Sequence, residues 1–234
     1  MRNAFVMRRH FAFLASLLAV VATPAAAQQI VIEEVVEVIV PASAAPVWHA
    51  PAAPIPRGIA AFGPFRVIDA HRAALVDVTD ERSPAQFSAM LRAFPGIAVL
   101  DMVECPGTLD DRGNLALGRM IRARGIATYV PRGGSVRSGA VELFLAGARR
   151  SADPAAEFAV HAWIDDAGKA PQDYPADAPE NRAYLDYYRE MGMSAQGAAA
   201  FYAMTNSVPF AAARWLGVAE LSRWVALDSS PMLQ

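Results

Sequence analysis

Short apolar runs alternate with helix-like stretches along the chain from about residue 62 onward. The runs typical of strands occupy 65–68, 74–78, 97–103, 126–130 and 157–163. Three intervening stretches fit helices, at 83–94, 113–124 and about 138–147. Ser83-Pro84 is a typical helix start, and Gly125 is a typical helix end. Strands and helices that alternate at this spacing predict βαβ units and an α/β fold.

The pattern changes after the last of these runs. Residues 166–180 are rich in Asp, Pro and Ala and predict a loop insertion near 165–180, which could act as a lid over a cleft. An amphipathic helix is expected over 181–192. Its tyrosines, Tyr184, Tyr187 and Tyr188, have the spacing of a packed or interface face, and gripping a peptide is the alternative.

The first 27 residues have the features of a secretory signal peptide. Three arginines precede an apolar block at 11–22, and small residues then end in an Ala-x-Ala site at Ala27. The block is too short to span a bilayer comfortably, so we expect cleavage after Ala27 and not retention as an anchor. The sequence therefore predicts a periplasmic or secreted protein with no integral membrane segment after signal cleavage.

Residues 28–61 form a lead-in to the folded domain. Its first part, 30–40, is β-branched enough for an extended strand, either an edge strand or a partner-binding arm. The part from 41 to 56 is rich in Pro and Ala and predicts a semi-extended linker. The α/β domain is expected to occupy 62–234.

Composition narrows the classes of function. The chain has 21 basic and 23 acidic side chains, so it carries no basic footprint for nucleic acid or for anionic lipid. Cys105 is the single cysteine, which excludes an intramolecular disulfide and a cysteine-rich zinc site. Because no nucleotide-binding loop or metal motif of recognisable spacing occurs, we expect neither a cofactor nor a bound metal.

Three places in the domain could carry chemistry. The Pro106-Gly107-Thr108 turn follows a buried strand, where backbone N–H groups can face a substrate. Ser138 follows a glycine-rich turn and starts an apolar helix, as a cap or as a nucleophile beside the helix N-terminus. His161 lies in an apolar strand, as a core residue or as a general base. His49 and His71 lie in the linker and near the domain start, so His161 is the best-placed base.

The joint spacing of these residues resembles the Clp-type serine peptidase family. The stretch from Ser138 to Gly147, then Pro154 and His161, matches the family's nucleophile helix, proline and histidine strand. The short connection from Gly147 to Pro154 resembles exported Clp-like proteins of bacteria. The turn at 104–108 is similar to the family's Ser-Pro-Gly-Gly turn. The resemblance covers roughly 62–230 and implies a ClpP/crotonase-like fold of repeated ββα units, with a mostly parallel sheet flanked by helices.

The resemblance also implies roles. Ser138 would be the nucleophile and His161 the general base, and the backbone N–H groups of Gly107 and Gly139 would form the oxyanion hole. The substrate would be a peptide or protein, and a homo-oligomer is expected from the same family.

The third member of the triad departs from the family. Residues 209–218 are similar to the family's last helix, and counting back from Gly217 puts the expected aspartate at Thr205 or Asn206. Asn206 is the best candidate, because papain-like sites work with an asparagine. Asp165 and Asp166 follow the histidine strand and are further candidates. Asn206 could equally be a helix cap, and the two aspartates could be solvated loop residues.

Two functions follow from these residues. One is an exported serine hydrolase, most consistent with a Clp-like peptidase that uses a Ser-His dyad or a Ser-His-Asn arrangement. The other is a catalytically inactive Clp-like fold that acts as a periplasmic binding or assembly module, which the missing carboxylate favours. Acyl-CoA chemistry on the related crotonase fold is a third choice, disfavoured because an exported protein would not meet that cofactor.

Overall fold

The strands of the domain form two sheets. The computed structural model describes residues 52–228, so the predicted signal peptide and most of the predicted 28–61 lead-in lie outside the described residues. The larger sheet has the order β1 (Ala60–Phe62), β2 (Phe65–Val67), β3 (Arg72–Leu75), β4 (Val99–Met102), β6 (Ala127–Val130) and β8 (Arg150–Ala152). The smaller sheet has the order β10 (Arg214–Gly217), β9 (Glu157–Val160), β7 (Ser135–Arg137) and β5 (Glu104–Cys105).

Most strand pairs are parallel, as predicted. Five of the eight pairs run parallel, and the antiparallel ones are β1 with β2, β2 with β3, and β9 with β10. The parallel pairs arise from a repeated unit of two strands and a helix. The first strand of each unit, β4, β6 or β8, joins the larger sheet, and the second, β5, β7 or β9, joins the smaller one. The predicted α/β fold with a mostly parallel sheet is therefore confirmed.

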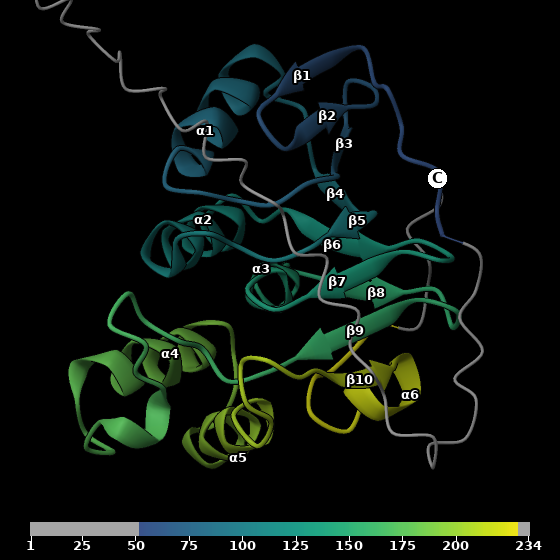
Figure 1. The fold of residues 1–234 in the computed structure, drawn as a ribbon. Helices are drawn as coiled ribbons and strands as arrows, with labels where there is room; N and C mark the ends of the chain where they lie inside the picture. The colour runs from purple at the N-terminus through teal and green to yellow at the C-terminus, as the bar shows by residue number, and fades with distance from the viewer. Residues whose placement is uncertain (1–51, 229–234) are drawn as a thin grey trace, which may run out of the picture. The chain divides into compact units, whose positions relative to one another are not determined.

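Six α-helices complete the described part of the chain. They are α1 (Ser83–Ala93), α2 (Asp111–Ala123), α3 (Ala140–Leu145), α4 (Pro179–Glu190), α5 (Ala195–Thr205) and α6 (Val218–Leu221). Helices α1, α2 and α3 lie along one side of the strands, and α4 and α5 lie together below them (Figure 1). Within residues 52–228, none of these helices combines the length and the apolar character needed to cross a membrane.

Local chemistry explains where the helices begin. Proline in the first turn of α1 needs no backbone donor, and the Asp110 side chain accepts a hydrogen bond from the Gly113 N–H and so caps α2. Ser194 caps α5 in the same way through the Gly197 N–H, at 3.0 Å. Gly125 follows α2 with a φ of 65°, the left-handed conformation that glycine adopts without steric cost.

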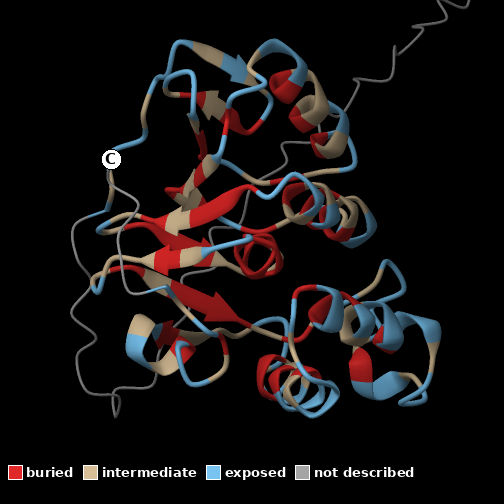
Figure 2. Cartoon of the chain, turned by 180° about the vertical axis from the view of Figure 1, so that it is seen from behind, coloured by how far each residue is buried: buried red, intermediate tan, exposed pale blue. Residues whose placement is uncertain are grey.

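The core lies between the strands and the helices that cover them. Strands of both sheets are buried along much of their length, whereas α4 and α5 expose their outer faces (Figure 2). Phe144 of α3 packs on Phe158 of β9 with ring centroids 5.0 Å apart. Tyr187 and Tyr188 of α4 are almost fully buried, at 0% and 1% exposure. Two of the three tyrosines on the predicted helix face, Tyr187 and Tyr188, therefore pack in the core.

One predicted element is wrong. The helix expected within 209–218 is instead a turn followed by β10, whose Arg214–Gly217 pairs with β9 in an antiparallel register. Helix α5 and the short strands β5, β7 and β8 are additional elements that the apolar pattern did not indicate. Strands of two or three residues are too short to show a period, so they cannot be recognised from alternation.

Candidate active site

Ser138 lies in a strained turn between β7 and α3. Its φ is 50°, and it is the one residue other than glycine with a positive φ in residues 52–228. Left-handed backbone is sterically costly for a residue with a Cβ atom and is concentrated at functional sites. The Ser138 N–H donates to the Ala159 carbonyl of β9 at 2.9 Å, which holds the turn against the strand that leads to His161.

Gly107 lies directly against the Ser138 side chain. It follows β5, is buried, and has a φ of 132°, which only glycine adopts readily. A Cβ atom at this position would lie 2.9 Å from Ser138 Cβ and 3.4 Å from Ser138 Oγ. The close approach of a backbone to the hydroxyl is the arrangement that an oxyanion hole requires.

Gly139 meets the same loop from the other side. A Cβ atom there would lie 2.6 Å from Thr108 Cγ2, so no side chain fits without a shift of the loop. Within residues 52–228, the N–H groups of Gly107 and Gly139 donate no hydrogen bond to a protein acceptor. Neither donor is therefore used by the fold, and Gly139 lines the cavity beside Ser138.

A buried pair, Thr79 and Asn114, braces these two glycines. The Gly107 carbonyl accepts from the Thr79 N–H at 3.1 Å and from its hydroxyl at 3.3 Å. Asn114 Nδ2 donates to the Gly139 carbonyl at 2.6 Å, and Asn114 Oδ1 accepts from Thr79 Oγ1 at 3.0 Å. Thr79 and Asn114 are almost fully buried. One hydrogen-bond network therefore fixes the backbone of both glycines next to Ser138.

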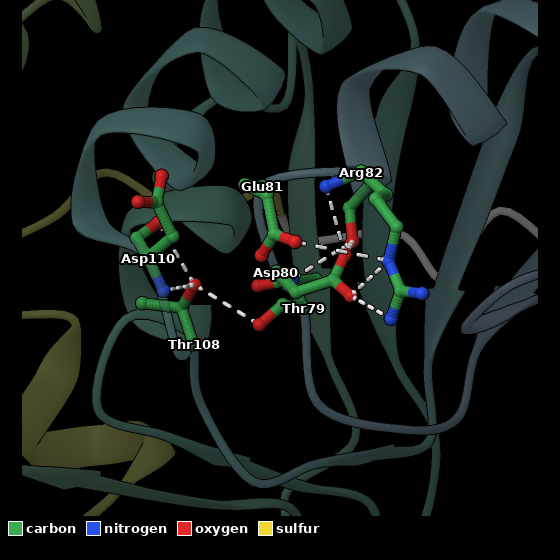
Figure 3. A network of polar contacts seen from close by, with 7 residues as sticks. Thr79, Asp80, Glu81, Arg82, Thr108 and Asp110 are labelled. Atoms are coloured by element: carbon green, nitrogen blue, oxygen red, sulfur yellow. Dashed lines mark hydrogen bonds and ion pairs between the residues drawn. The ribbon is translucent and has the colours of Figure 1, made fainter.

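The loop from β5 to α2, which contains Gly107, is held by further hydrogen bonds. Thr108 Oγ1 donates to the Thr79 carbonyl at 3.2 Å and accepts from the Asp110 N–H at 3.1 Å. Figure 3 shows the Thr108 side chain between Thr79 and Asp110, beside the Asp80–Arg82 ion pair. The Thr108 side chain therefore ties the loop from β5 to α2 to the backbone at Thr79.

His161 follows β9 and is half-buried. Its Nδ1 lies 2.9 Å from the Ala162 carbonyl, and its ring meets the Phe210 ring edge-on with centroids 5.0 Å apart. A carbonyl only accepts hydrogen bonds, so this contact assigns the proton to Nδ1 and leaves Nε2 free to take one. A general base needs a ring nitrogen placed in this way, with the other nitrogen held by the backbone.

Ser138 and His161 line the same small cavity. Its volume is about 40 Å³, enough for a few water molecules but not for a substrate side chain. No hydrogen bond joins Ser138 Oγ to the His161 ring in the described part of the chain. Such contacts are often longer in unliganded enzymes and tighten when substrate binds.

A larger cleft of about 430 Å³ opens outside this cavity and is also lined by Ser138 and His161. Leu109, Ile164 and Phe210 line it and are exposed by 78%, 39% and 53%. These are three of the five large apolar side chains exposed within residues 52–228. The cleft therefore offers an apolar surface next to the candidate nucleophile.

The three candidates for the third triad member lie in different surroundings. Asn206 lines the inner cavity, but it follows α5, and its Nδ2 donates back to the Tyr202 carbonyl at 2.7 Å. Asp165 accepts from the Ala167 and Lys169 N–H groups at 2.9 and 2.8 Å and from the Tyr174 hydroxyl, which together lower its pKa. Asp166 is exposed on the outer cleft. Among the described residues, no hydrogen bond joins any of these side chains to His161.

Two acids that the sequence analysis missed line the same cavity as the candidate nucleophile. Asp111, the first residue of α2, and Glu142, in the first turn of α3, both line the inner cavity. Glu142 is 7% exposed and accepts a hydrogen bond from the Tyr188 hydroxyl at 2.7 Å. Burial raises the pKa of Glu142 to about 7, although the Tyr188 hydrogen bond opposes the shift. The sequence signal was the spacing, since Glu142 lies one helical turn after Ser138.

Glu142 is expected to make the fold less stable near neutral pH than at pH 5. Its ordinary pKa is 4.5, and its folded pKa is about 7, so between these values the unfolded chain loses a proton that the folded chain keeps. The free energy of unfolding therefore falls as pH rises across this interval, by about 3 kcal/mol in total. Glu142→Gln, which keeps an acceptor for Tyr188, should remove this contribution.

Urea unfolding of both proteins at pH 5 and pH 8 tests this expectation. Glu81→Gln is the matched control, because the Glu81 side chain is 69% exposed. The difference between pH 5 and pH 8 should shrink in Glu142→Gln and stay as it is in Glu81→Gln. An equal pH dependence in all three proteins would contradict the assignment.

Other side chains that could serve as nucleophiles or ligands are less suitable. Cys105 is fully buried, which raises the pKa of its thiol and disfavours the reactive thiolate. Within residues 52–228, no three His, Cys, Asp or Glu side chains lie close enough to hold a metal ion. Of the predicted tyrosine face, Tyr184 and Tyr188 line the inner cavity, and Tyr184 stacks on Trp163 with ring centroids 6.2 Å apart.

No family model and no curated protein matches the chain. Among solved structures, it is similar to a variant of the 1510-N membrane-bound stomatin-specific protease in complex with a substrate peptide, at 13% identity and a TM-score of 0.43, over 65% of this chain and 73% of that chain. Another variant of that protease is 13% identical with a TM-score of 0.47, over 68% of this chain and 77% of that chain. A ClpP1 variant from Listeria monocytogenes is 14% identical with a TM-score of 0.46, over 68% of this chain and 90% of that chain.

Proposed function

We propose that the protein is an exported serine hydrolase, a Clp-like peptidase in which Ser138 is the nucleophile and His161 the general base. The observation that carries the proposal is that Ser138, His161 and Gly139 line one cavity, while the Gly107 backbone lies directly against the Ser138 side chain. The strained backbone of Ser138 supports it, because a residue with a Cβ atom needs a reason to stay left-handed.

The reaction follows from these positions. Ser138 Oγ attacks the carbonyl carbon of the scissile amide, and its proton passes to His161 Nε2. The negative charge that forms on the carbonyl oxygen is stabilised by the N–H groups of Gly107 and Gly139. His161 then returns the proton to the leaving amine, which gives an acyl-enzyme. Water, deprotonated by His161, hydrolyses the acyl-enzyme and restores Ser138.

The substrate in this proposal is a peptide or protein. The outer cleft has a volume of about 430 Å³, and its exposed apolar side chains can contact apolar residues next to the scissile bond. Export by the predicted signal peptide would put the site in the periplasm or outside the cell, and assembly into a homo-oligomer belongs to the same proposal.

The alternative is a catalytically inactive fold that binds a partner in this cleft. The lack of a direct hydrogen bond between Ser138 and His161 among the described residues favours it. So do the contacts of Asn206, Asp165 and Asp166, whose side chains are engaged elsewhere or exposed.

Labelling with a fluorophosphonate probe separates the two functions. The protein without residues 1–27 is treated with the probe, and the modified peptide is located by mass spectrometry. We expect one phosphonyl group on Ser138, because only an activated serine reacts readily. Heat-unfolded protein is the control and should remain unlabelled. A folded protein that does not react would contradict the hydrolase and favour the binding module.

A further inference from the structure

A carboxylate reaches the candidate site from α2. Asp111, Ser138, His161 and Trp163 are the four residues that line both the inner cavity and the outer cleft. Asp111 therefore lies at the boundary between the inner cavity and the outer cleft, as Ser138 and His161 do. Neither Glu142 nor Asn206 reaches the outer cleft, and neither Asp165 nor Asp166 reaches the inner cavity.

Asp111 and His161 also interact electrostatically. Burial is the main influence on Asp111 and raises its pKa. The Tyr184 hydroxyl opposes this shift, the charge of Asp110 adds to it, and the charge of His161 lowers the pKa by a smaller amount. Attraction between two groups is reciprocal, so an ionised Asp111 favours a positively charged His161. Asp111 thus lines the same cavity as His161, and its charge favours the positively charged form of that histidine.

A triad aspartate performs two tasks, since it orients the histidine and stabilises the imidazolium. We propose that this chain divides them: the Ala162 carbonyl orients His161 through Nδ1, and the Asp111 carboxylate stabilises the positive charge that His161 gains from Ser138. The inference rests on the proposed function. Asp111 is a positioning residue in this arrangement, because it acts on the substrate only through His161.

The groups around Asp111 suit this role. Glu142 of α3, Tyr184 and Tyr188 of α4 and Tyr202 of α5 line the inner cavity with it, while Asp110 precedes it and Arg112 follows. The buried Tyr184 hydroxyl makes no hydrogen bond within 3.5 Å among the described residues, but it lies near enough to Asp111 to lower the pKa of that carboxyl. After burial, the charge of Asp111 is the main influence that raises the pKa of Tyr184, which places that donor next to the carboxylate. Tyr184 is thus available to hold Asp111 in place.

Asp111→Asn tests the inference, with Asp166→Asn as the matched control. Both changes remove one negative charge from the outer cleft, but Asp166 does not line the inner cavity. The first readout is the NMR titration of the His161 ring proton, assigned by its loss in His161→Ala. In Asp111→Asn the midpoint should move to lower pH by about 0.5 unit or more, because the charge that favours the imidazolium is gone. Asp166→Asn should move it less.

The second readout is the rate of fluorophosphonate labelling across pH. Asp111→Asn should label about tenfold more slowly on the plateau, with the acidic limb shifted to lower pH. A His161 midpoint that moves no further in Asp111→Asn than in Asp166→Asn would overturn the inference, even if Ser138 reacts. A midpoint that moves in a protein that never reacts would support the Asp111–His161 pair and reject the hydrolase.

Discussion

Replacing Ser138 with alanine is expected to abolish peptide hydrolysis and fluorophosphonate labelling. Replacing His161 with alanine should lower both by about a thousandfold or more. Without the hydroxyl there is no atom to form the acyl bond, and without the imidazole the proposed general base for the hydroxyl proton is lost. The double variant should be no slower than Ser138→Ala, because residues that act as a unit have non-additive effects.

Matched controls exist for both changes. Ser222 is exposed in the turn after α6, and His71 is exposed with its Nδ1 3.1 Å from the Gly96 carbonyl. Alanine at either position should leave the rates within about twofold, as expected for surface sites away from the chemistry. Hydrolysis that survives in Ser138→Ala would reject Ser138 as the nucleophile.

Gly107→Ala should have the second largest effect. The new Cβ would lie 2.9 Å from Ser138 Cβ, and the φ of 132° is strained for alanine, so the turn must move away from Ser138. Loss of one oxyanion donor typically costs about 100-fold to 1,000-fold in kcat, and we expect a fall of that size with a smaller change in KM.

Gly125→Ala separates this effect from the general cost of a left-handed alanine. Gly125 has a φ of 65°, and a Cβ there meets nothing within 4 Å. We expect it to lower the free energy of unfolding by about 1 kcal/mol, measured by urea unfolding, while kcat stays within about twofold. Equal activity in Gly107→Ala and the unsubstituted protein would remove Gly107 from the hole.

Part of this site could be predicted because its signals are local. Ser138, Gly107 and His161 each follow a strand of the smaller sheet, β7, β5 and β9, which lie side by side in parallel. The carboxyl ends of parallel strands meet at one edge, so residues that follow them come together. In the structure Ser138 and His161 line one cavity and Gly107 lies against Ser138, and their catalytic roles stay predictions.

The rest could not be predicted because it depends on contacts between distant elements. Thr79 and Asn114 are 35 positions apart and read as ordinary polar residues, and their purpose emerges only where both meet the glycines. Asp111 looks like one of several acids at a helix start. The position of Asn206 was counted back through a predicted helix that is β10 in the structure, so that count carried no spatial meaning.

The left-handed backbone of Ser138 also bears on how the chain balances folding against reactivity. Glycine at position 138 would avoid a cost of about 1 kcal/mol, and Gly107 and Gly133 show that nearby turns use it. A module that needed only to fold and hold a partner would gain by that exchange. Retaining a hydroxyl there sacrifices stability at one point, as sites that perform chemistry commonly do.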